Sequence, residues 1–83
     1  MENTLAAQKV IFPDLLNVMR ERYNVLYTIS LYAPIGRRGL IEQTGYPERL
    51  IRKETELLHK QNLIDMTTKG MYITTAGKII LDD

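Results

Sequence analysis

The sequence predicts a mainly α-helical fold with one small β-hairpin. Three observations lead to this prediction. Residues 37–62 contain two helical patterns separated by Gly45, a long apolar helical pattern precedes them, and residues 63–74 alternate in hydrophobicity around a short turn. At 83 residues the chain is expected to be a single domain whose core buries roughly 60% of the unfolded surface.

Two helices joined by a tight turn are predicted between residues 37 and 62. Gly45 can adopt the left-handed backbone conformation that ends the first helix, and Pro47 presets φ for the first turn of the second. In the second helix three apolar residues recur at helical spacing and predict the buried face: Ile51, Leu57 and Leu58. This layout is typical of a helix-turn-helix.

A long helix before this motif is expected to provide the main hydrophobic wall of the domain. Pro13 disfavours helical geometry at Phe12, so the chain should break or kink there, with a helix from Pro13 to about Ala33. Residues 1–12 would then form a weakly amphipathic lead-in. The apolar stripe of the long helix is predicted to comprise Leu15, Leu16, Met19, Tyr23, Leu26 and Ile29.

A β-hairpin follows the helix-turn-helix. Residues 63–67 and 71–74 are expected to form its strands around a turn at residues 68–70, and Ile35 could add an edge bridge. Helix, edge strand, helix, turn, helix, hairpin, helix is the element order of a winged helix-turn-helix domain.

The last predicted helix begins after Thr74, whose side chain should cap it, and Gly77 would permit close approach to the helix beneath. This helix is too short to be stable alone, so we expect the chain to be a fragment cut at a domain boundary.

Composition argues against several classes of protein. There is no cysteine, which excludes disulfides and thiolate metal sites and makes a reducing, cytoplasmic compartment the default. Apolar runs are far shorter than the roughly 18 residues of a membrane-spanning helix. The single histidine, His59, has no partner at metal-ligand spacing, and no nucleophile and base can be paired, so no catalytic, cofactor-binding or metal residue is predicted.

The distribution of charge is more informative than the net charge of +1. Residues 37–60 contain six Lys or Arg and four Glu, and several of the cations share one helix face. A solvated helix with pairs such as Glu48–Arg52 and Glu56–Lys60 explains the same pattern. Charge alone therefore leaves DNA binding and a solvated face equally open.

If the second helix of the motif binds DNA, its N-terminal half would face the base edges in the major groove. The candidates for base readout are Glu48, Arg49, Arg52 and Lys53. Arg37 and Arg38, with the first-turn amides of the preceding helix, are placed to bind phosphates, and Lys69 at the wing tip could reach a phosphate or the minor groove. Tyr46 is expected to contact the core instead.

Four stretches together cover most of the chain: PDLLNVMRERYNVLYTI, PIGRRGL, GYPERLIRKETELLHKQNLID and GMYITTAGKIIL. In these stretches the chain resembles the N-terminal DNA-binding domain of SorC/DeoR-type bacterial transcriptional repressors. The resemblance implies binding of double-stranded operator DNA and repression of sugar or glycolytic genes, without a cofactor in this chain. It also implies an absent C-terminal domain that binds a sugar-phosphate effector and provides most of the oligomerisation.

Two positions depart from the pattern of this family. Glu54 falls where many helix-turn-helix sequences have a core residue, so Thr55 is expected to point inward instead. Pro47 replaces a Ser or Thr cap, which leaves capping to Thr44 or to the turn itself.

A winged helix can also serve as a protein-interaction module, here through Leu50, Leu57 and the N-terminal apolar residues. An enzymatic function would require turnover that depends on His59. The sequence has no long heptad repeat, so a monomer or weak dimer is expected, with residues 1–12 able to fold back or to pair with another chain.

Overall fold

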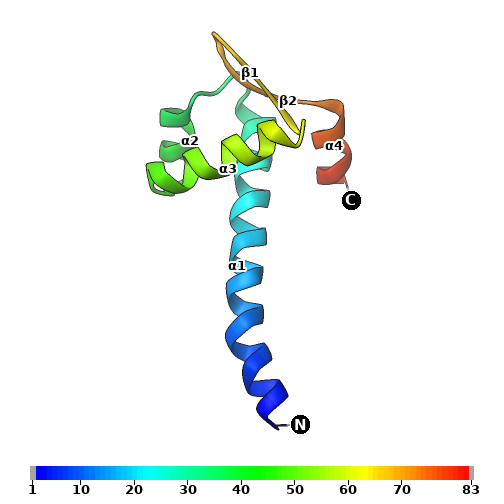
Figure 1. The fold of residues 1–83 in the computed structure, drawn as a ribbon. Coiled ribbons are helices and arrows are strands. Elements are labelled where there is room, and N and C mark those ends of the chain that lie inside the picture. The colour runs from blue at the N-terminus through cyan, green and yellow to red at the C-terminus, as the bar shows by residue number, and fades with distance from the viewer. Residues whose placement is uncertain (1, 83) are drawn as a thin grey trace.

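The computed structural model describes the backbone of residues 2–82 and the side chains of residues 15–82. Its elements are α1 (Glu2–Tyr32), α2 (Arg37–Thr44), α3 (Glu48–Lys60), β1 (Ile64–Thr67), β2 (Gly70–Ile73) and α4 (Thr75–Asp82). Figure 1 shows α1 as a long stem, with the other elements gathered around its C-terminal half. This arrangement confirms the predicted winged helix-turn-helix.

The helix α1 does not break at Pro13. It is continuous from Glu2 to Tyr32, so the predicted break at Phe12 and the separate lead-in are wrong. Proline removes one hydrogen bond and crowds one carbonyl inside a helix, at a cost of about 3 kcal/mol. The flanking sequences are rich in Leu, Ala, Gln, Lys and Arg, which favour helix on both sides of the proline. The contacts expected of residues 1–12 lie outside the described side chains.

Among the side chains of residues 15–82, the hydrophobic core lies around the C-terminal half of α1. Its buried members are Val25, Leu26, Ile29, Ile35, Leu40, Ile51, Leu58, Ile64 and Met71. The predicted wall is correct for Leu26 and Ile29 but wrong for Leu15, Leu16, Met19 and Tyr23, which are 47–58% exposed. In Figure 1 the other elements gather around the C-terminal half of α1, and the exposed fractions show that they do not bury these four side chains.

The hairpin pairs β1 with β2 in antiparallel register, with Ile64 opposite Ile73 and Thr67 opposite Gly70. Ile35 forms the predicted edge bridge with Met71: the Met71 amide donates to the Ile35 carbonyl at 2.8 Å and the reverse bond measures 3.3 Å. This bridge fixes the start of α2 beside the hairpin.

The final helix α4 begins as predicted, because the amide of Gly77 donates to Thr74 Oγ1 at 3.1 Å. The close approach predicted at Gly77 involves different elements. A Cβ at this position would meet the Leu63 carbonyl oxygen and, at 2.7 Å, Cγ1 of Ile73. Gly77 therefore allows α4 to pack on the hairpin and its approach segment, and the prediction of a helix beneath it is wrong.

Candidate nucleic-acid interface

The turn between α2 and α3 is held by its backbone and by Thr44. Gly45 has φ of 74° and its amide donates to the Ile41 carbonyl at 2.8 Å, which ends α2 as predicted. The Tyr46 amide donates to Thr44 Oγ1 at 3.2 Å. Pro47 precedes the first turn of α3 as its N-cap residue, and no side chain of the described residues caps this helix. Thr44 therefore braces the turn rather than the start of α3.

The buried face of α3 comprises Ile51, Glu54, Thr55 and Leu58. The inward positions of Ile51, Thr55 and Leu58 agree with the sequence prediction. Tyr46 packs against the core, as expected, and its hydroxyl accepts a hydrogen bond from Asn24 Nδ2 at 2.8 Å. These contacts turn the opposite face of α3 outward.

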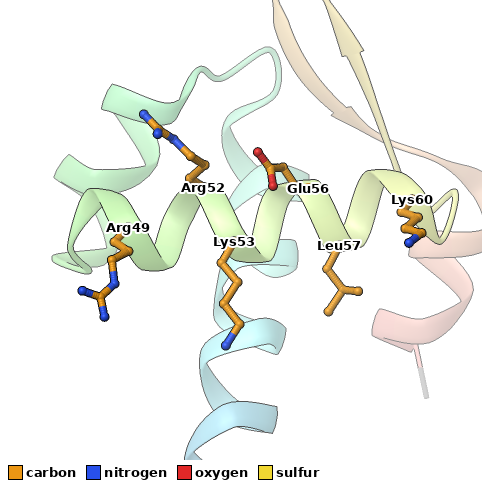
Figure 2. Close-up of a pocket in the computed structure, with 6 residues that line it drawn as sticks. All are labelled: Arg49, Arg52, Lys53, Glu56, Leu57 and Lys60. Carbon is orange, nitrogen blue, oxygen red and sulfur yellow. The ribbon is translucent and has the colours of Figure 1, made fainter.

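The exposed face of α3 is mostly cationic. Its side chains line a shallow hollow of about 400 Å³, formed by Arg49, Arg52, Lys53, Glu56, Leu57 and Lys60 (Figure 2). Figure 2 shows Arg49, Lys53 and Leu57 pointing to one side of α3. Leu57 was predicted to belong to the buried stripe, but it is only half-buried and lies in this cationic row.

Of the two ion pairs that the sequence suggested on α3, one forms. Arg52 Nη2 donates to Glu48 Oε1 at 3.0 Å, with both side chains exposed. Lys60 has no ion-pair partner among side chains 15–82, and the same holds for Arg49 and Lys53. The face therefore retains several cations that are available to a polyanion.

The remaining predicted residues flank α3. Arg37 at the start of α2 lines a second hollow, of about 330 Å³, together with Thr55 and Glu56 of α3 and Thr67 and Gly70 of the hairpin. Lys69 occupies the two-residue turn at the tip of the hairpin. All seven predicted DNA-binding side chains, Arg37, Arg38, Glu48, Arg49, Arg52, Lys53 and Lys69, are exposed.

One structural feature of α3 was not predicted from the sequence. Glu54 was expected to yield the inward position to Thr55, but both side chains are buried, each 1% exposed. Arg22 of α1 donates from Nε to Glu54 Oε2 at 2.8 Å. Glu54 lies three residues after Ile51 and four before Leu58, and this helical spacing indicated that it belongs to the buried face. Its partner, Arg22, lies 32 residues away in the chain, so no local pattern indicated the ion pair.

Other kinds of site find no support in the part of the chain that is described. Residues 2–82 contain no helix long and apolar enough to cross a bilayer. The described side chains, those of residues 15–82, include no group of three or more potential metal ligands.

The bracing helix α1, the α2–turn–α3 unit and the adjacent hairpin form a winged helix-turn-helix, with an exposed and mostly cationic face on α3. Residues 18–83 match the family model of the CggR N-terminal DNA binding domain, and the chain belongs to this family. It is therefore a DNA-binding domain.

The chain is similar to the central glycolytic genes regulators of Bacillus subtilis (strain 168) and Priestia megaterium, with 44% and 41% identity over 98% of its length. It spans 24% of the length of these relatives. A solved structure of a protein with unknown function from Listeria innocua Clip11262 superposes with a TM-score of 0.70 at 17% identity, covering 98% of this chain and 67% of that one. This last similarity shows the fold alone.

Proposed function

We propose that this domain binds operator DNA by placing α3 in the major groove, as part of a cytoplasmic repressor of central glycolytic genes. The gene class comes from the names of the two relatives. The observation that carries the DNA geometry is the division of α3 into two faces: Ile51 and Leu58 hold it in the core, whereas Arg49, Arg52 and Lys53 project from it into solvent.

Each exposed residue has a proposed role that follows from its position. The N-terminal half of a major-groove helix lies nearest the bases, so the exposed side chains of this half of α3 contact base edges. They are Glu48, Arg49, Arg52 and Lys53. Arg37 and Arg38 bind phosphate beside the first turn of α2, and Lys69 extends the contact to a neighbouring phosphate. The hollow that Arg37 shares with α3 and the hairpin supports one continuous DNA-facing surface.

The rest of the regulator would complete this function. Because the chain spans about a quarter of its relatives, we place the sugar-phosphate effector site and most of the oligomerisation in the remainder of the protein. A single domain then contacts one half-site, and avidity from linked domains supplies the additional affinity.

The test is selection of duplexes from a random library, followed by affinity measurements over a range of salt concentrations. We expect one sequence class to be enriched and log affinity to fall steeply with log salt, by about 0.9 for each phosphate contact. A scrambled duplex of the same composition is the control. No enrichment, combined with salt-insensitive binding of a protein partner, would instead support the interaction-module alternative.

A further inference from the structure

The ion pair between Arg22 and Glu54 joins the stem of the domain to the middle of its DNA-facing helix. Glu54 lies on the buried face of α3 and is almost completely removed from solvent, whereas Arg22 of α1 is 35% exposed. Replacing a buried ion pair by well-packed apolar side chains often leaves a protein equally stable or more so. The pair therefore needs an explanation beyond stability.

A second polar contact joins the same two parts of the molecule. Asn24 lies two residues after Arg22 on α1, and its Nδ2 donates to the hydroxyl of Tyr46 at 2.8 Å. Tyr46 lies in the turn immediately before α3, and Glu54 lies near the middle of that helix. The two contacts thus hold α3 near its middle and in the turn just before its start.

Polar contacts restrict rotation of a helix in a way that apolar contacts do not. Ile51 and Leu58 attach α3 to the core through dispersion and the hydrophobic effect, which have little directionality. A hydrogen bond weakens steeply with misalignment and holds its two atoms within a narrow range of distance. The side chains of Arg22 and Asn24 therefore define the orientation of α3 about its own axis.

This orientation determines where the base-contacting side chains point. At about 100° per residue, Arg52, a proposed base contact, projects about 160° away from Glu54 on the opposite side of the helix, and so does Glu56 beside it. Figure 2 shows both side chains on the same side of α3. A rotation of about 20° at an outer radius of about 6 Å would move a side chain by about 2 Å, which is enough to break a hydrogen bond to a base.

We propose that Arg22 and Glu54, together with Asn24 and Tyr46, are positioning residues for sequence discrimination, acting through the orientation of α3. This proposal rests on the proposed placement of α3 in the major groove. It predicts that loss of the contacts lowers the preference for the operator over other DNA. Non-specific binding should persist, because its phosphate-contacting cations are unchanged.

The main test is the double variant Arg22→Met/Glu54→Met, which removes the ion pair without changing the net charge. Affinities are measured for the duplex that the wild-type chain enriches from a random library and for its scrambled version, at a temperature where both proteins are folded. We expect the ratio of the two affinities to fall about tenfold or more, with the same affinity for the scrambled duplex and the same salt slope. An unchanged ratio in this folded variant would overturn the proposal.

A second variant, Tyr46→Phe, serves where the double variant does not fold. It removes one hydroxyl and leaves the ring in the core, and we expect a fall in the ratio of about threefold. An unchanged ratio here, without a folded double variant, also overturns the proposal. The matched control is the charge-neutral change Arg20→Gln/Glu21→Gln on the same helix, for which the ratio should stay at the wild-type value.

The wild-type measurement distinguishes failure of the proposed function from failure of the positioning proposal. A wild-type chain with no preference between the duplexes contradicts the proposed function, and the positioning proposal fails with it. If the wild-type chain discriminates and the variants discriminate equally well, only the positioning proposal fails.

Discussion

Arg52 donates from Nη2 to Glu48 Oε1 at 3.0 Å across one turn of α3, and the two side chains are 55% and 64% exposed. An exposed pair at this spacing contributes only about 0.3–0.5 kcal/mol. The guanidinium is therefore held on the outward face of the helix in the free domain, and it can exchange its carboxylate partner for a base at small cost.

We expect Arg52→Ala to weaken operator binding by about 1–3 kcal/mol and to relax the preference at one base position, because a bidentate arginine–guanine pair supplies discrimination of this size. Affinities for a panel of duplexes with single base changes measure both effects. Arg20→Ala, a change on the exposed stem, is the control. Equal loss on every duplex would make Arg52 a phosphate contact, and no loss would remove the proposed recognition face.

The buried and exposed faces of α3 were predictable from the sequence, except at Glu54, whose burial depends on a residue far away in the chain. Helical spacing placed Ile51 and Leu58 inside and the arginines outside. The same spacing also puts Glu54 inside, but burial of a carboxylate requires a partner. That partner, Arg22, comes from another helix, and no local pattern could identify it. Leu57 shows the opposite kind of error: helical spacing predicted that it is buried, but it lies at the edge of the exposed face.

Replacement of Ile51 tests how α3 is anchored. The side chain is fully buried, so Ile51→Ala should lower the free energy of unfolding by about 2–5 kcal/mol, through lost burial and the cavity left behind. Chemical denaturation measures the change. Leu57→Ala, at a half-buried position of the same helix, is the matched control and should cost about 1 kcal/mol or less. An unchanged midpoint for Ile51→Ala would contradict the orientation of α3.

The largest difference between expectation and structure concerns α1. Periodicity predicts which side chains share a face, but it does not show whether another element covers that face. Leu15, Leu16 and Met19 share the stripe of Leu26 and Ile29, yet they are 50–58% exposed and do not belong to the core. The helix also continues through Pro13, because the loss of one hydrogen bond does not outweigh helix-favouring sequence on both sides.

The packing of α4 depends on the absence of a side chain at Gly77. In Gly77→Ala the new methyl group would meet the backbone oxygen of Leu63, which cannot move without shifting β1 or α4. We expect a loss of about 1–3 kcal/mol in the free energy of unfolding, measured by thermal or chemical denaturation. Gly36→Ala is the control, because a Cβ there meets no described atom within 4 Å and φ is −93°. Equal stability of the Gly77 variant and the wild type would show that the α4 contact is looser than described.

Removal of the Lys69 charge tests whether the wing contacts DNA. The hairpin turn is held by Thr67, whose hydroxyl donates to the Gly70 carbonyl at 2.8 Å and accepts from the Lys69 amide at 3.2 Å. The Lys69 side chain takes no part in these bonds, so Lys69→Ala should leave the denaturation midpoint unchanged.

The same variant should reduce the steepness of log affinity against log salt by about 0.9, because one fewer counterion is released when one phosphate contact is lost. Lys78→Ala removes an equal charge from an exposed position of α4; it is the matched control and should leave the slope unchanged. If the slope is the same for Lys69→Ala and the wild type, the wing does not touch phosphate, and the DNA-facing surface is confined to α2 and α3.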